Sequence, residues 1–290
     1  MNDITPRQYR GTLLERAAAR FDLSPRAPLA GPSFAAPAVP RPPRATVAID
    51  RAGLAERGMV EPGGAVTPLA EEFRLVKRHV LGEARALTRE RGDAARMVLL
   101  SSAKPGDGKT FCAVNLALSL AAERDLEILL VDADFAKPDV LATLGVAAEG
   151  PGLLDAIADP AIDVEDCILA TDVPQLMLLP AGRKSATDTE LVASDRAHAI
   201  LARLAAASPR RIVLFDSSPA LEASPAAVLA GHVGQTIVVV RADRTSEADL
   251  RATVALLDAC DHLELLLNSV AFQPGGRRFG NYYGQEASKP

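Results

Sequence analysis

The sequence contains no tryptophan, three cysteines and no apolar run long enough to cross a membrane. Cys112, Cys167 and Cys260 are far apart and show no CxxC spacing, which argues against a disulfide framework and against a cysteine-based zinc site. A membrane-spanning helix needs roughly 20 consecutive apolar residues, and the N-terminus lacks the basic and apolar regions of a signal peptide. The chain is therefore expected in the cytoplasm, with any membrane role exerted through a partner.

Metal-binding spacing and a strongly basic composition are also missing. The four histidines, His79, His198, His232 and His262, lie far apart in the sequence, so structural or surface roles are expected for them. The formal net charge is −5, yet residues 1–60 carry nine arginines against five acidic residues, which leaves the remainder of the chain strongly acidic. An acidic body argues against nucleic acid as the main partner.

The residues that are present divide the chain into three parts. Residues 1–65 are rich in proline, alanine and arginine and are expected to be disordered, because they contain too few large apolar residues to form a core. Within them, the apolar spacing of residues 13–21 predicts either a transient helix without function or an element that docks on a partner or an anionic membrane. Residues 66–271 are expected to form a globular domain, and residues 272–290 a flexible tail.

Short apolar segments alternate with segments of helical periodicity through the predicted domain. Continuous apolar runs indicate strands buried on both faces, and helices between consecutive strands indicate a parallel sheet. The prediction is an α/β fold with a doubly wound, mostly parallel sheet, whose site lies at the carboxyl ends of the strands. The expected strands are 97–101, 126–132, 176–179, 211–216, 236–241 and 263–268, and the expected helices are 71–81, 109–122, 152–158, 194–207, 224–230 and 246–258.

A phosphate-binding loop is predicted where the first of these strands meets the next helix. In the segment SSAKPGDGKT, Gly106 and Gly108 allow backbone amides to converge on phosphate oxygens, and the following helix contributes its positive N-terminal end. Lys109 is expected at the β- and γ-phosphates and the Thr110 hydroxyl at Mg²⁺. Ala103 stands where the GxxxxGK[ST] pattern has its first glycine. The predicted nucleotide-binding residues are Ala103, Lys104, Pro105, Gly106, Asp107, Gly108, Lys109, Thr110 and Phe111.

Three aspartates follow two other predicted strands. Asp132 and Asp134 end the run ILLVDAD, and Asp216 ends the run IVLFD. Phosphoryl transfer needs carboxylates for the metal ion and for the attacking nucleophile, although an aspartate at such a position can alternatively cap the next helix. Three carboxylates at strand ends, in a sheet that also carries a phosphate loop, favour metal binding and catalysis.

Together these segments resemble the bacterial tyrosine kinases of polysaccharide export, whose P-loop ATPase domain has a deviant Walker A motif like that of partition ATPases. Residues 103–110 are similar to their Walker A motif, 128–138 to a second motif that ordinary P-loop kinases lack, and 212–219 to their Walker B motif. The similarity covers residues 71–268, including 180–197. The subgroup that it resembles most is the single-chain autokinases encoded with exosortase-type exopolysaccharide systems.

The resemblance implies ATP and Mg²⁺ as cofactors and catalytic roles for Lys109, Asp132, Asp134 and Asp216. Lys109 and Thr110 would hold the phosphates and the metal ion, and Asp132 would orient or deprotonate the attacking tyrosine hydroxyl. Asp134 would support the metal site, and Asp216 would hold Mg²⁺ through water. The implied metal-binding residues are Thr110, Asp132 and Asp216.

The family phosphorylates a C-terminal tyrosine cluster, with one subunit acting on the tail of its neighbour. Tyr282 and Tyr283 are the candidates in this chain, either as functional sites or as an inert remnant. The resemblance also implies a ring of identical subunits, a separate inner-membrane chain-length regulator that activates and localises the kinase, and a cognate tyrosine phosphatase. Glu71, Arg74 and Lys77 fit the acidic–arginine helix that packs between subunits, or that helix simply covers the sheet.

Two other functions fit parts of the sequence. Lys104 precedes Lys109 by five residues, the spacing of the lysine that acts across the dimer in cell-division and partition ATPases, so a positioning ATPase switch is one alternative. A solvated loop lysine is the other interpretation of Lys104. The second alternative function is a nucleotide-binding scaffold for the membrane chain-length regulator. Asn268 ends the last predicted strand, where related ATPases contact adenine; a turn residue is equally compatible with it.

Overall fold

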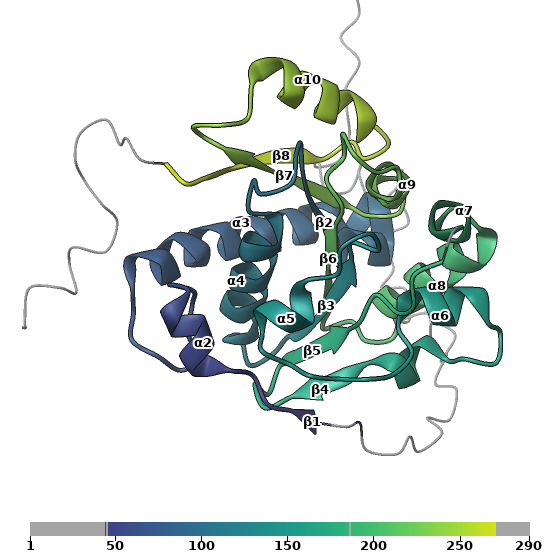
Figure 1. Cartoon of the computed structure of the whole chain (residues 1–290), viewed down its shortest axis with the longest axis horizontal. Coiled ribbons are helices and arrows are strands. Elements are labelled where there is room, and N and C mark those ends of the chain that lie inside the picture. Colours follow the sequence, from purple (N-terminus) through teal and green to yellow (C-terminus); the bar gives the residue numbers. More distant parts are fainter. Residues whose placement is uncertain (1–43, 45, 186, 271–290) are drawn as a thin grey trace, which may run out of the picture. The chain divides into compact units, whose positions relative to one another are not determined.

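The structure, a computed structural model, describes residues 44, 46–185 and 187–270, which form an eight-stranded sheet covered by helices (Figure 1). The strand order is β1-β4-β5-β3-β6-β2-β7-β8. All neighbouring strands are parallel except β4 and β5, which are antiparallel. The strands are β1 (Thr46–Val47), β2 (Met97–Ser102), β3 (Glu127–Ala133), β4 (Leu169–Thr171), β5 (Leu176–Leu179), β6 (Arg211–Ser217), β7 (Gln235–Arg241) and β8 (Leu263–Asn268).

Helices cover both faces of the sheet because successive strand residues face opposite sides. Leu100 and Leu130 belong to a buried cluster with residues of α3 and α4, whereas Leu99 and Leu129 belong to a second cluster with residues of α6, α8 and α9. The α-helices are α2 (Arg51–Glu56), α3 (Pro68–Arg91), α4 (Lys109–Ala121), α5 (Val140–Thr143), α6 (Leu153–Ala158), α7 (Asp188–Val192), α8 (Asp195–Ala206), α9 (Pro225–Ala230) and α10 (Glu247–Leu256), and the short 3₁₀ helices are η1 (Gly92–Arg96) and η2 (Val164–Cys167).

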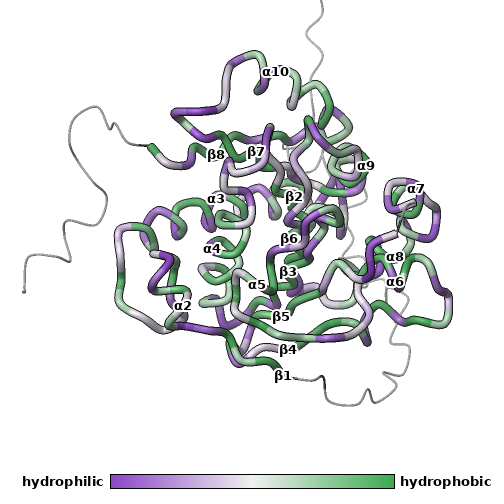
Figure 2. The backbone as a smooth tube through the Cα atoms, viewed as in Figure 1, coloured by the Kyte–Doolittle hydropathy of each residue, from purple (hydrophilic) through white to green (hydrophobic). Residues whose placement is uncertain are grey.

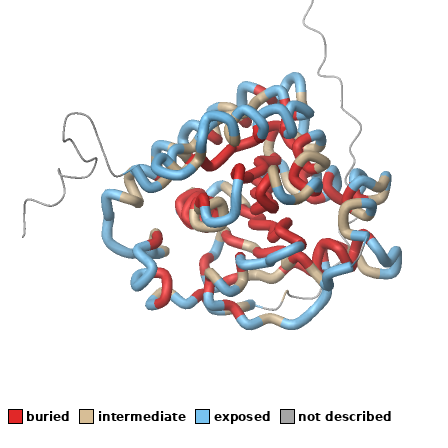
Figure 3. Tube along the Cα trace, turned by 45° about the horizontal axis from the view of Figure 1, so that its top comes forward, coloured by how far each residue is buried: buried red, intermediate tan, exposed pale blue. Residues whose placement is uncertain are grey.

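Burial is concentrated in the central strands. All residues of β2 and β6 are buried, and buried residues gather along the sheet while helices and loops present their exposed residues outward (Figure 3). This is the layered arrangement that continuous apolar strand segments predict. The six predicted strands are confirmed with their ends within one residue, and so is the mostly parallel sheet.

Helix α3 is longer than its predicted span of residues 71–81. The Thr67 hydroxyl accepts a hydrogen bond from the Ala70 N–H and Pro68 is the first helical residue, a combination that favours a helix start at this point. Hydrophilic and hydrophobic residues alternate along the helix (Figure 2), and its apolar face, which includes Phe73, Val80 and Leu87, is buried. None of the helices that the structure describes has the length and apolar character needed to cross a bilayer.

The prediction of disorder through residue 65 is wrong for residues 46–65. Strand β1 pairs with β4, and α2 follows it directly. Ile49, Leu54 and Met59 are buried in the cluster that also holds α3 and α4. These elements are only two and six residues long, so they carry too little periodicity to be detected beside a proline-rich segment. Residues 1–43, with the predicted helix at 13–21, and residues 271–290 lie outside the described residues.

Replacing Leu54 with alanine should lower the free energy of unfolding by about 2–5 kcal/mol, the usual cost of a cavity left by a buried leucine. Leu54 is 0% exposed, whereas Leu75 of α3 is 44% exposed, so Leu75→Ala is the matched control and should change stability by about 0.5 kcal/mol or less. Urea unfolding of the full chain measures both values. An equally small effect of the two substitutions would show that residues 46–65 do not belong to the folded domain.

Candidate functional site

The loop between β2 and α4 has the geometry of a phosphate-binding loop. Gly106 and Gly108 have φ angles of 81° and 97°, in the left-handed region that favours glycine. The buried Asp107 carboxylate accepts a hydrogen bond from the Lys104 N–H at 3.0 Å, which closes the loop on itself. No side chain caps the N-terminus of α4, so its first N–H groups can bind an anion.

Asn268 fixes the loop from the other side. Its Nδ2 donates to the Asp107 carbonyl at 2.9 Å, and a Cβ atom at position 108 would lie 2.1 Å from this nitrogen. The loop conformation and the close approach of β8 therefore both require glycine at position 108. In this structure the Asn268 side chain supports the phosphate loop through a hydrogen bond, and Asn268 is therefore more than a turn residue.

The predicted carboxylates come together next to Lys109. Asp132 and Asp216 are register partners on the adjacent parallel strands β3 and β6. Lys109 Nζ lies 2.7 Å from Asp134 Oδ2 and 3.9 Å from Asp216 Oδ1. All three aspartates are buried, with at most 4% of their surface exposed. The topology thus brings together residues more than 80 positions apart, as the doubly wound fold predicts.

The low polarity of the site and the charges within it shift the pKa values of its ionisable side chains. Burial raises the pKa of Asp132 to about 7, with a further contribution from the Asp216 charge, although the N–H groups of Val140 and Asp134 oppose the shift. Burial likewise raises the pKa of Asp216 to about 6, while Lys109 and the Thr110 hydroxyl oppose it. Burial alone would lower the pKa of Lys109, but the carboxylates of Asp216, Asp134 and Asp132 outweigh it and raise that pKa. Such shifts are typical of functional sites.

The donor set fits a magnesium ion. Both carboxylate oxygens of the fully buried Asp216 lack a hydrogen bond of ordinary geometry from any described residue, which is costly unless a ligand satisfies them. Asp216, Asp132 and the Thr110 hydroxyl offer only oxygen donors, which Mg²⁺ prefers. These residues would hold the ion beside the phosphates.

A cavity of 480 Å³ opens beside these groups and is within the usual size range of small-molecule sites. Its lining includes Pro105, Gly106, Lys109, Thr110, Phe111 and Asp134. Of the other predicted nucleotide-binding residues, Ala103 is buried at the end of β2. Lys104 is exposed, is not part of the cavity lining and forms an ion pair with Asp249 of α10 at 2.7 Å, which holds the pKa of that carboxyl below its usual value.

Two arginines beside the loop were not predicted from the sequence. Arg241 Nη1, at the end of β7, donates to the Gly106 carbonyl at 3.1 Å. The Arg244 guanidinium is the nearest group to the position that a Cβ atom would occupy at residue 106. Neither residue belongs to a phosphate-loop pattern. Only their place at the carboxyl end of a predicted strand, with Arg241 as its last residue and Arg244 three residues later, could have indicated this role.

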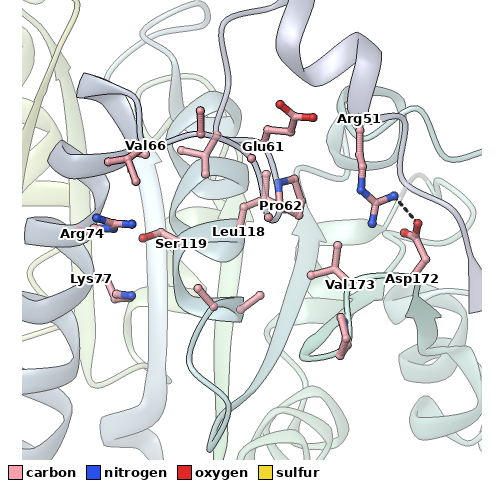
Figure 4. A pocket seen from close by; sticks show the side chains of 18 residues that line it. Arg51, Glu61, Pro62, Val66, Arg74, Lys77, Leu118, Ser119, Asp172 and Val173 are labelled. Carbon is pink, nitrogen blue, oxygen red and sulfur yellow. Dashed lines mark hydrogen bonds and ion pairs between the residues drawn. The ribbon is translucent and has the colours of Figure 1, made fainter. Parts of the chain in front are cut away.

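The three residues predicted for subunit contacts do not share one environment. Glu71 and Arg74 form an ion pair one turn apart on α3, whereas Lys77 is 7% exposed and pairs with Glu123 at 2.7 Å. Arg74, Lys77 and Ser119 line one side of a 430 Å³ cavity, and the Arg51–Asp172 ion pair lies on its other side (Figure 4). In this chain Lys77 therefore contributes to the packing of α3.

Replacing Asp216 with asparagine should stabilise the nucleotide-free protein at pH 8. The folded-state pKa of Asp216 is raised from 3.8 to about 6, so the native carboxyl binds its proton more tightly than the unfolded one, and stability is lost as pH rises from about 4 to 6. The variant removes this cost, about 3 kcal/mol at pH 8, and gains little at pH 4. Exposed Asp258→Asn is the control. Thermal unfolding of metal-free protein measures the gain, and an equal gain at both pH values would contradict the explanation.

Comparison with known proteins agrees with this geometry. Residues 95–261 match the family described as AAA domain. The tyrosine-protein kinase wzc of Salmonella typhimurium is 27% identical over 192 residues, 66% of this chain and 26% of the relative. The putative tyrosine-protein kinase EpsB of Ralstonia nicotianae is 29% identical over 187 residues, 63% of this chain and 24% of the relative. The chain thus spans about a quarter of the length of these curated relatives.

Among solved structures, the VpsO kinase domain is 30% identical with a TM-score of 0.53, and the match covers 65% of this chain and 96% of that domain. The family match includes β2, α4, β3 and β6, the elements that position Lys109 and the three aspartates. The chain therefore belongs to the AAA domain family and, within it, to the bacterial tyrosine kinases.

Proposed function

We propose that this chain is an ATP- and Mg²⁺-dependent tyrosine autokinase that regulates exopolysaccharide polymerisation or export. The observation that carries the proposal is the group formed by the partly buried Lys109 and the buried Asp132, Asp134 and Asp216 beside the phosphate loop. A binding scaffold would need the loop and its lysine, but it would not need three desolvated carboxylates. The raised pKa of Asp132, about 7, suits a base that accepts a proton near neutral pH.

The chemical step uses the residues in distinct roles. Asp132 accepts the proton of the tyrosine hydroxyl while the phenolic oxygen attacks the γ-phosphorus and the bond to the β–γ bridging oxygen breaks, leaving ADP. Lys109 exchanges its contact with Asp134 for the phosphate oxygens and stabilises their charge. The helix N-terminus of α4 supports the same oxygens. Bound Mg²⁺, held by Asp216 and Thr110, would neutralise charge on the phosphates.

The proposed acceptors are Tyr282 and Tyr283 of a neighbouring subunit in a ring. The proposed setting is the cytoplasmic side of the inner membrane, where a separate chain-length regulator would hold and activate the kinase and a phosphatase would reset it. The family relationship supports these partners.

Incubation of the full chain with Mg·ATP should add phosphate to Tyr282 or Tyr283. Lys109→Ala should abolish the modification, because no other side chain of the described residues places a cation beside the three aspartates. Intact-mass and peptide mass spectrometry measure the product, with and without the cytoplasmic segment of the candidate membrane regulator.

Tyr9 is the third tyrosine of the chain and provides the matched control. Tyr9→Phe should leave phosphate incorporation unchanged, whereas the double variant Tyr282→Phe/Tyr283→Phe should remove it. ATP hydrolysis without tyrosine phosphate, even with the regulator present, would contradict the proposal and favour an ATPase switch.

Replacement of Lys104 provides a second test that separates a tyrosine autokinase from an ATPase switch. In an ATPase switch that uses this lysine across a dimer, Lys104→Ala should reduce ATP turnover by about 10²-fold or more, the usual loss of a transition-state contact. Since Lys104 pairs with Asp249 of its own chain, we expect its replacement to change phosphate transfer by no more than a few-fold. Single-turnover phosphorylation of Lys104→Ala beside the wild-type chain measures the difference.

A further inference from the structure

Three side chains with metal-binding atoms meet between α3 and β8, away from the phosphate loop. His79 and Glu83 lie on α3 and Glu264 lies on β8, and one ligand atom from each lies within 4.8 Å of the other two. This cluster is not predictable from the sequence, because Glu264 is 185 residues from His79 and no recognised spacing links them.

The backbone positions of the cluster are fixed by packing. His79 and Glu83 are one helical turn apart, so their side chains share a face of α3. Glu264 lies on the same face of β8 as Leu266, which packs against the buried cluster that contains Phe73 and Val80 of α3. The contact between helix and strand therefore brings the three ligands together without a metal ion.

The cluster holds two carboxylates, those of Glu83 and Glu264, but only one group that can pair with them, the imidazole of His79. His79 Nε2 lies 2.8 Å from Glu264 Oε1, and Glu83 forms no hydrogen bond or ion pair with any residue that the structure describes. A carboxylate beside an already paired carboxylate is better compensated by a divalent cation than by a single imidazole. The side chains are partly exposed, which leaves room for water in the remaining coordination positions.

We propose that His79, Glu83 and Glu264 form a binding site for a divalent transition metal of the zinc class. Imidazole nitrogen and carboxylate oxygen are both ligand types that Zn²⁺ accepts, with water completing the coordination, whereas Mg²⁺ prefers oxygen ligands alone. The site lies outside the proposed catalytic residues and does not depend on the kinase activity. Bound metal joins α3 to an edge strand of the sheet, and so stabilises the contact between them.

The test is a calorimetric titration of the chelator-treated full chain with Zn²⁺, in saturating Mg·ADP so that the phosphate-loop carboxylates are occupied. The wild-type chain should bind one equivalent, and His79→Ala should lose it. Glu83→Gln and Glu264→Gln should each weaken binding by about tenfold or more, since each removes one charged ligand. Zn²⁺ should also raise the melting temperature of the wild-type chain but not that of His79→Ala.

His198→Ala is the matched control. His198 Nδ1 lies 2.9 Å from His232 Nδ1, so these two imidazoles are an alternative place for Zn²⁺ to bind among the described residues. Replacing His198 should leave the binding of one Zn²⁺ per chain unchanged. Zinc binding that is retained in His79→Ala, or lost in His198→Ala, would overturn the proposal. Because His79 is exposed, its replacement should not unfold the chain, and circular dichroism of each variant checks this point.

Discussion

Lys109 lies among three buried carboxylates at the carboxyl ends of β3 and β6, and the opposite charges of these groups make each other tolerable in a site of low polarity. An isolated charge in this position would be too costly to bury, and pairing with Asp134 and Asp216 makes it tolerable. Burial raises the pKa values of Asp132 and Asp216 to about 7 and about 6, and repulsion between the neighbouring carboxylates adds to both shifts. The site therefore favours the binding of cations to its carboxylates. It also favours the binding of phosphate groups, which can replace Asp134 and Asp216 as the partners of Lys109.

Elements far apart in the chain hold this charged group in place. Parallel pairing of β3 with β6 puts Asp132 opposite Asp216, and the β2–β6 and β2–β7 pairs hold the phosphate loop beside them. Asn268 of the edge strand β8 and Arg241 of its neighbour β7 donate hydrogen bonds to carbonyl groups of the loop. The Lys104–Asp249 ion pair adds a contact to α10. The loop conformation is therefore set by the tertiary structure as much as by its own glycines.

The sequence predicts those parts of the structure that depend on strong local patterns. Continuous apolar runs located six strands within one residue, and the glycine–lysine pattern located the phosphate loop. Residues 46–65 were missed because a two-residue strand and a six-residue helix have no periodicity, although Leu54 is fully buried. The contacts of Lys77 with Glu123 and of Arg241 with Gly106 were also beyond prediction, because they depend on how distant elements pack.

Helix α3 shows how that packing limits what a sequence motif can do. Glu71, Arg74 and Lys77 have the spacing of a subunit-contact motif, yet the buried Lys77 is neutralised by Glu123 within the same chain. Of the three residues of this motif, only Glu71 and Arg74 are exposed enough to contact another subunit, and they are paired with each other. Because this ion pair is partly exposed, its net energy is small and it can exchange partners at little cost. The Lys77–Glu123 pair cannot exchange partners in this way, because Lys77 is buried. Glu71 and Arg74 can therefore contact another subunit, whereas Lys77 cannot.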